Sequence, residues 1–192
     1  MSPRGADPLL AGLAAGREEA FTALYDRYAG RMLRAALGWL TRREDAEDAV
    51  QEVFTALVRS RRKLAGVNDL AAYLFTALRR AAGRIAERRG REPAASEAAR
   101  QAVQPADRPP EGPRAERVAR ALRALPAEQR EVIGLKIDGG LTFGQIAEVT
   151  GVSPNTAASR YRYALEKLQA ALPAGEVGGS KRSATVPHAA ED

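Results

Sequence analysis

The sequence has no cysteine, and its one histidine, His188, stands four residues before the last residue of the chain. The lack of cysteine excludes disulfide bonds, thiolate nucleophiles and thiolate-bound zinc. A catalytic base or metal ligand at His188 would rest on a chain end, where order is usually poor. No group of carboxylates, histidine and cysteine stands at a usable spacing. We therefore expect no catalytic residue, no metal and no cofactor, and an enzyme such as a hydrolase is the least favoured class of function.

Long hydrophobic runs are also missing. No apolar run approaches the ~20 residues that a membrane-spanning helix needs, and residues 1–16 lack a basic region followed by a continuous apolar block. We therefore expect a cytoplasmic protein without membrane insertion. Aromatic residues make up only 5% of the chain, and no segment alternates strictly between apolar and polar residues as a half-buried strand does. The expected fold class is all-α.

Large apolar residues are scarce in two stretches, which cannot bury a core. Residues 91–115 hold five prolines and only Val103 as a sizeable aliphatic residue, and residues 173–192 are rich in glycine and other small residues. We expect a flexible linker over 91–115, a flexible tail over 173–192 and a flexible N-terminus over 1–16. Two small helical domains remain, over 17–90 and 116–172.

Apolar residues in the first block recur with helical spacing, from Phe21 to Tyr28 and again from Leu33 to Leu40. Thr41 and Glu44 resemble a capping box and predict a helix that starts there. Its apolar face is expected at Ala46, Ala49, Val50, Val53, Phe54, Leu57 and Val58.

Another helix is expected after Asn68 or Asp69, either of which can cap it. Its buried stripe is expected at Leu70, Tyr73, Leu74, Ala77, Leu78, Ala81 and Ile85. Tyr73 is accordingly expected in the core rather than in contact with nucleic acid.

The second block contains the pattern of a helix-turn-helix. The small residue Ala147 lets two helices approach closely, and Gly151 four positions later permits a left-handed turn. Thr142 with Gln145 predicts a capping box before the first helix, and Ser153 with Pro154 predicts the start of the second. An ordinary helical hairpin with a glycine turn is the alternative.

Charge is unevenly distributed along the chain, which carries 30 Lys and Arg against 24 Asp and Glu, a net charge of +6. The segment from Thr41 to Glu52 has five acidic residues and two arginines, whereas Arg79 to Arg91 has six arginines and one glutamate. The first suits a basic protein partner and the second suits phosphate. Solvated helix faces are the alternative for both.

These motifs resemble a known family. The segments Ala20–Tyr28 and Arg43–Phe54 are similar to region 2 of the sigma-70 family, and Leu125–Arg130, the helix-turn-helix and Asn155–Tyr161 are similar to region 4. Nothing between the blocks resembles region 3. The chain therefore resembles the small extracytoplasmic-function (ECF) sigma factors, which are not enzymes.

The resemblance implies partners and site residues. It implies core RNA polymerase, whose β′ clamp helices would be gripped by Asp45, Asp48, Gln51 and Glu52. It implies promoter DNA, with the −10 element captured and melted near Asn68, Arg79, Arg80, Arg84 and Arg88. The −35 element would be read by Asn155, Thr156, Ser159, Arg160 and Arg162. Many members are also held by an anti-sigma factor.

The chain departs from the family along the −10 helix, where Tyr73, Arg80 and Arg84 stand in place of the usual Trp, Asn and Asp. A linker of residues 91–115 averages ~25 to 30 Å as a coil, so it does not itself fix the distance between the blocks, and we expect weak promoter binding without polymerase. The main alternative function is a free-standing helix-turn-helix regulator that binds operator DNA as a dimer.

Overall fold

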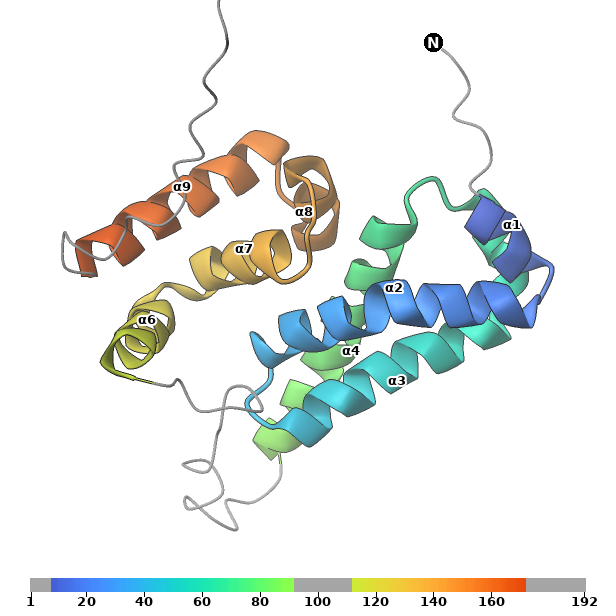
Figure 1. Ribbon diagram of the computed structural model, residues 1–192, viewed down its shortest axis with the longest axis horizontal. Helices are drawn as coiled ribbons and strands as arrows, with labels where there is room; N and C mark the ends of the chain where they lie inside the picture. Colours follow the sequence, from blue (N-terminus) through green and yellow to red (C-terminus); the bar gives the residue numbers. More distant parts are fainter. Residues whose placement is uncertain (1–7, 92–111, 172–192) are drawn as a thin grey trace, which may run out of the picture.

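The computed structural model describes residues 8–91 and 112–171, which form helices joined by short turns (Figure 1). The first block contains α1 (Pro8–Ala14), α2 (Glu18–Leu37), α3 (Arg43–Arg59), the 3-10 helix η1 (Arg61–Gly66) and α4 (Leu70–Arg91). The second block contains α6 (Pro113–Ala124), α7 (Ala127–Ile137), α8 (Phe143–Thr150) and α9 (Pro154–Ala171). The all-α expectation is confirmed. The predicted tail and most of the predicted linker lie outside the described residues.

The first block is built on α2, α3 and α4, which pack against one another along their lengths (Figure 1). Burial of apolar side chains is the main force that stabilises such a bundle. The centre of the bundle contains side chains that are fully buried or nearly so: Leu24, Met32, Ala46, Ala49, Leu57, Leu74, Leu78 and Ala81.

The N-terminal region differs from the expectation of a flexible segment over 1–16. Helix α1 packs on α2 and η1, and Leu13 is fully buried. Gly12 permits this close approach, because a Cβ atom on residue 12 would lie 2.7 Å from the Cβ atom of Ala20. Residues 1–7 lie outside the described part of the chain.

Most of the predicted helix caps are present. The Thr142 hydroxyl accepts from the Gln145 amide at 3.2 Å, and the Gln145 side chain accepts from the Thr142 amide at 2.8 Å, which completes the capping box. Asp69 caps α4 by accepting from the amide of Ala72 at 2.9 Å. The predicted box of Thr41 and Glu44 is wrong. The N-cap of α3 is Arg42 rather than Thr41, and no side chain caps this end; Glu44 forms an ion pair with the Arg42 guanidinium at 2.8 Å instead of reaching back to the amide of residue 41.

The two blocks are not separate in space. One continuous hydrophobic core contains Leu74, Phe75 and Leu78 from α4 together with second-block residues such as Leu135 and Leu141. Helix α8 lies against the first turns of α4 (Figure 1). A smaller cluster of Leu125, Ile133 and Ala164 joins α6, α7 and α9 within the second block.

Polar contacts also join the blocks. The Arg31 guanidinium on α2 donates from Nε to the carbonyl oxygen of Gly139 at 2.9 Å. Arg79 on α4 pairs with Glu131 on α7 at 2.6 Å. The side-chain Nε2 of Gln145 on α8 donates to the Asp69 carboxylate at 2.9 Å. Each of these bonds connects residues that are more than fifty positions apart in the sequence.

Asp138, at the end of α7, should make stability depend on pH. Burial raises the pKa of its carboxyl group, and the attraction of Arg34 opposes this only in part. A raised pKa means that the folded chain holds the proton more tightly than the unfolded chain, so this group favours folding at low pH and its contribution is lost as pH rises through the raised pKa. We expect Asp138→Asn to raise the Tm near pH 7. Near pH 4 we expect a smaller difference between the Tm of the variant and the Tm of the unsubstituted chain. A lower Tm near pH 7 would contradict this sign.

Candidate nucleic-acid and protein interfaces

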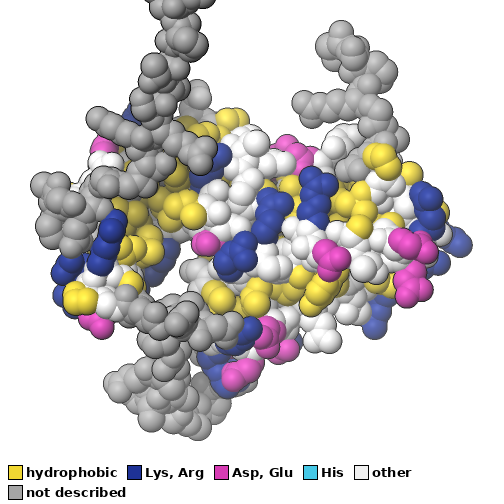
Figure 2. Space-filling view, viewed as in Figure 1, with side chains coloured by type: hydrophobic (Ala, Val, Ile, Leu, Met, Phe, Trp, Pro, Cys, Tyr) yellow, Lys and Arg dark blue, Asp and Glu magenta, His cyan; other side chains and the backbone are white. Residues whose placement is uncertain are grey.

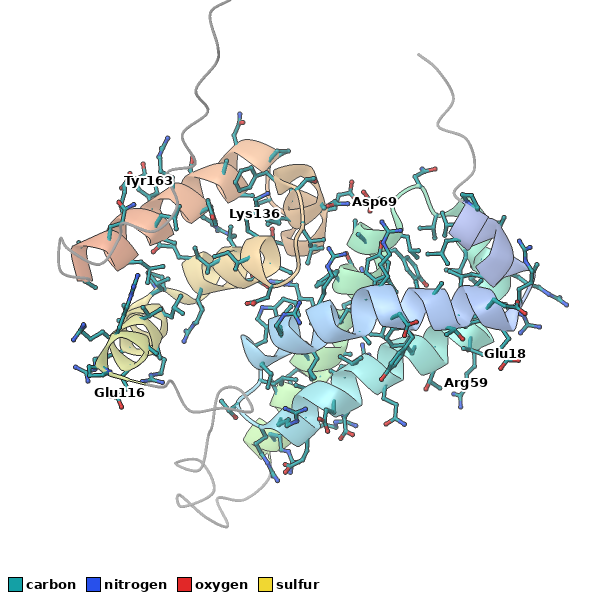
Figure 3. All side chains as sticks on the ribbon, viewed as in Figure 1. Glu18, Arg59, Asp69, Glu116, Lys136 and Tyr163 are labelled. Atoms are coloured by element: carbon teal, nitrogen blue, oxygen red, sulfur yellow. The ribbon has the colours of Figure 1, made fainter. Side chains whose placement is uncertain are left out.

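An open groove with a volume of about 690 Å³ runs between the connector after η1 and the exposed side of α4. Side chains of both blocks line it: Val67, Asn68, Tyr73, Arg80, Arg84 and Glu148. Figure 3 shows Asp69 at the start of α4, where the groove meets α8. The groove thus combines an aromatic ring, an amide and two guanidinium groups, which are the groups that bind unstacked bases and phosphates.

The expectation that Tyr73 packs in the core is wrong. Its side chain is 38% exposed and lines the groove. Phe75, which was not in the predicted stripe, is fully buried instead. The physical reason is that α4 contacts two sets of helices, α2 and α3 on one side and α8 on another, so its buried arc is shifted away from Tyr73.

The predicted −10 residues do not all lie together. Asn68, Arg80 and Arg84 line the groove. Arg88 is exposed two turns beyond Arg80 on α4. Arg79 lies away from the groove, where its hydrogen bond to Glu131 raises the pKa of the guanidinium.

The predicted polymerase-binding residues on α3 have different surroundings. Asp45 is only 4% exposed and pairs with Arg89 of α4 at 2.9 Å, so its carboxylate binds within the block. Glu52 pairs with Arg84. Asp48 and Gln51 are exposed, and Asp48 has no ion pair among the described residues.

An apolar patch, which the sequence analysis did not identify, lies beside Gln51. It consists of Tyr25, Phe54 and Val58, with Tyr25 58% and Val58 46% exposed. The rings of Tyr25 and Phe54 are 5.2 Å apart between centroids. Figure 2 shows apolar side chains along the seam between α2 and α3, with acidic side chains beside them. Val58 was predicted on the buried face of α3, and this prediction is wrong. The predicted apolar face was wider than the stripe that a surface helix usually buries, and this excess was the available signal that some of its residues would be exposed.

The helix-turn-helix has the expected geometry. Gly151 ends α8 in the left-handed region at φ 74°. The amide of Thr156 donates to the Ser153 hydroxyl at 3.1 Å, which caps α9. On α9, Asn155 and Thr156 are exposed in the first turn.

The remaining predicted −35 residues lie further along α9. Ser159 and Arg160 are half-buried, whereas Arg162 is exposed and its guanidinium lies 5.2 Å from the Tyr163 ring centroid. The face formed by Asn155, Ser159 and Arg162 has the spacing of one helix surface, so these side chains can reach the same DNA groove.

The part of the chain that the structure describes has neither a metal-binding cluster nor a membrane-spanning helix. No group of His, Asp and Glu side chains there could hold a metal ion. None of the described helices is long and apolar enough to cross a membrane.

Comparison with known proteins gives two family models and several solved structures. Residues 24–92 match "Sigma-70 region 2", and residues 115–168 match "Sigma-70, region 4". No curated protein sequence matches the chain. CnrH, solved in complex with the cytosolic domain of CnrY, is similar at 26% identity over 84% of this chain and 93% of its own, with a TM-score of 0.60.

A second solved structure is similar in fold. The sigma factor RpoE from Bartonella quintana, solved with the anti-sigma factor NepR, has 23% identity over 85% of this chain and 91% of its own, with a TM-score of 0.52. The two family models together cover most of the described residues, with region 2 before region 4 along the chain. The chain therefore belongs to the sigma-70 family and has the two-domain arrangement of the ECF sigma factors.

Proposed function

We propose that this sigma factor binds core RNA polymerase through α3, captures and melts the −10 element in the groove on α4, and reads the −35 element with α9. The observation that carries the proposal is the groove lined by Tyr73, Arg80 and Arg84, on the same three-helix block as the exposed acidic and apolar surface of α3. One block thus offers separate surfaces to DNA and to a protein partner.

Core polymerase would bind the surface formed by Asp48, Gln51 and the apolar patch. Interfaces gain affinity from a few buried aromatic and aliphatic anchors, and charges around them set orientation and association rate. Tyr25 and Val58 are exposed anchors of this kind. Asp45 would contribute indirectly, since its pair with Arg89 ties α3 to α4.

The groove would hold a base displaced from the −10 duplex. Unstacking a base costs a few kcal/mol, and stacking on an aromatic ring returns ~1 to 3 kcal/mol per base. Tyr73 supplies the ring and Arg80 supplies charge for the phosphates of the same strand, and Arg84 would add to this charge only after leaving Glu52. Arg79 would contribute to DNA binding only after leaving Glu131.

We expect Asn155→Ala to cost ~1 to 3 kcal/mol in −35 binding at particular base pairs, because an exposed side chain in the first turn of a recognition helix contacts base edges. The measurement is promoter binding by the polymerase complex over a set of single-base −35 variants. Gln169→Ala, on the exposed far end of α9, is the matched control. A loss that is the same for every −35 sequence would mean that Asn155 contacts phosphate.

The overall proposal is tested by co-elution of the purified chain with core RNA polymerase, measured beside its binding to duplex DNA alone. We expect stable association with polymerase and weak duplex binding. Tight, sequence-specific duplex binding by a dimer, without polymerase association, would favour the helix-turn-helix regulator instead.

We also propose an anti-sigma factor as a partner. The support is the resemblance and the two similar structures, since RpoE is solved with the anti-sigma factor NepR and CnrH with the cytosolic domain of CnrY.

A further inference from the structure

Lys136 lies in the last turn of α7, near the starts of α8 and α9 (Figure 3). Its side chain is half-buried and has two partners. The ammonium group donates to the carbonyl oxygen of Leu141 at 3.0 Å, and Nζ lies 4.9 Å from the ring centroid of Phe143. Leu141 and Phe143 stand on either side of Thr142, the N-cap of α8. One ammonium group therefore joins the end of α7 to the start of α8.

A positive charge suits this place. A carbonyl oxygen and the face of an aromatic ring both carry partial negative charge, so a cation between them attracts both. The dipole of α8 opposes a cation at its N-terminus, so the specific contacts to Leu141 and Phe143 are what hold the ammonium group there. Without this group the part-buried carbonyl of Leu141 would lose its donor, which is unfavourable.

The ring of Phe143 continues the contact to the recognition helix. It meets the ring of Tyr161 on α9 edge-on, with 5.6 Å between the centroids and 62° between the planes. Tyr161 packs against both the shared core and the smaller cluster of the second block. Lys136, Phe143 and Tyr161 thus form a series of contacts from α7 through α8 to α9, which we call the α7–α9 link.

Tyr161 lies on the buried face of α9. Ala157, Tyr161 and Ala164 share this face, and both alanines are 0% exposed. Alanine lets helices pack closely but has no side chain that would resist rotation of α9 about its axis, so the ring of Tyr161 is what fixes this rotation. Asn155 lies six residues earlier, or ~9 Å along the axis. The α7–α9 link therefore sets the direction in which the first turn of α9 points.

Recognition of base edges depends on this direction. A hydrogen bond weakens steeply when its angle falls below ~120°, and a recognition site tolerates only ~10 to 20° of misorientation. The attraction of a charge to phosphate depends on distance and much less on angle. Loosening of α9 should therefore reduce discrimination between bases more than it reduces binding to DNA of any sequence.

We propose that Lys136 is a positioning residue for −35 recognition. By holding Phe143 against Tyr161, it fixes the rotation of α9 at which Asn155 and Thr156 meet the base edges. The inference rests on the proposed function and adds to it a residue that acts on sequence discrimination through α9.

Lys136→Met and Lys167→Met form a matched pair of variants. Each removes one positive charge from the second block, and Lys167 is exposed on the far half of α9. The measurement is binding by the polymerase complex to promoters with single-base changes in the −35 element. We expect Lys136→Met to weaken binding to the best −35 sequence about tenfold and to have little effect on the poorest. We expect Lys167→Met to leave the ratio between the two sequences unchanged.

Two results of this comparison would overturn the inference. One is an equal ratio between best and poorest −35 sequences in the two variants. The other is a loss in Lys136→Met that is the same for every sequence, with a salt dependence reduced by about one charge, because that result means phosphate contact.

Three more variants test the route through Phe143. Lys136→Arg keeps the charge and its donors, and a guanidinium can stack on a ring, so we expect it to restore most of the discrimination. Phe143→Leu keeps an apolar side chain without the ring, and we expect it to narrow discrimination as Lys136→Met does. The double variant should be no worse than the larger single loss, because the two residues act in one series of contacts. Additive losses, or no rescue by Lys136→Arg, would overturn the α7–α9 link.

Hydrogen exchange on the free full-length chain separates this inference from the proposed function. We expect the backbone amides of residues 157–161 to exchange about tenfold faster in Lys136→Met than in Lys167→Met, with exchange in α2, α3 and α4 unchanged. Equal exchange in α9 would overturn the positioning role. If the polymerase complex of the unsubstituted chain does not discriminate among −35 sequences, the proposed reading of the −35 element fails, and exchange still decides whether Lys136 holds α9.

Discussion

Asp48→Lys is expected to weaken association with core RNA polymerase about tenfold, and the double variant with Glu52→Lys about a hundredfold. Asp48 is exposed and has no ion pair among the described residues, so its charge is available to a basic partner. Reversing a charge at a complementary interface replaces attraction with repulsion and costs several kcal/mol when the site is desolvated. Co-elution or titration with labelled core polymerase measures the change at fixed salt.

The control for this variant must match its change in net charge. Glu116→Lys alters an exposed acid on α6, away from α3 (Figure 3), and adding Glu18→Lys at the start of α2 matches the double variant. We expect neither control to affect association beyond the weak effect of net charge. Glu52→Lys also disturbs Arg84, its partner, so Asp48→Lys alone is the cleaner test. Unchanged association in Asp48→Lys would refute the assignment of α3 to polymerase binding.

Phe75→Ala is expected to destabilise the chain by ~3 to 5 kcal/mol, the usual cost of truncating a fully buried aromatic side chain. Phe75 is 0% exposed and contacts both blocks. For a chain of this size such a loss lowers the Tm by about 6 to 20 °C. Because the core is shared, we expect tertiary signals from both blocks to be lost over the same range of temperature.

Tyr73→Ala, two positions earlier on the same helix, is the control. It removes an aromatic side chain of similar size that is 38% exposed, so the loss of stability should be much smaller, about 1 kcal/mol. Phe75→Leu, which keeps most of the buried volume, should lie between the two. Similar losses in Tyr73→Ala and Phe75→Ala would contradict the shared core.

Features that depend on neighbouring residues were predictable from the sequence. The capping box of Thr142 and Gln145 and the left-handed turn at Gly151 involve residues within a few positions of one another. The same holds for the amphipathic spacing of α2, α3 and α4. These local signals, together with their order along the chain, were enough to predict the all-α fold class and the family.

Features that depend on distant residues were not predictable in this way. The helical spacing of apolar residues predicts one buried stripe on α4. In the structure α4 packs both on α2 and α3 and on α8, and α8 follows α4 by more than fifty residues in the sequence. Tyr73 was therefore assigned to the core, where it does not lie, and the buried Phe75 was left out of the predicted stripe. The expected flexible linker also suggested independent blocks, since a sequence pattern does not reveal which helix faces will meet.

Asp45 illustrates the same limit within the candidate site. Its place in an acidic segment suggested a surface role, whereas the structure buries it against Arg89, 44 positions later. The spacing of four residues between Asp45 and the buried Ala49 was a signal that Asp45 lies on the inner face of α3. Both residues belong to the same acidic motif, but only Asp48 is exposed and can contact a protein partner, whereas Asp45 is buried.

The burial of Phe75 also has a consequence during synthesis on the ribosome. Its partners around Gly139 and Leu141 are translated roughly 60 residues later, which takes about 3 to 13 s at 5 to 20 residues per second. During that interval the nascent first block presents an unshielded apolar surface, of the kind that chaperones bind and that promotes aggregation. Slow codons after α4 should therefore lower the yield of folded chain, whereas slow codons after α9 should not.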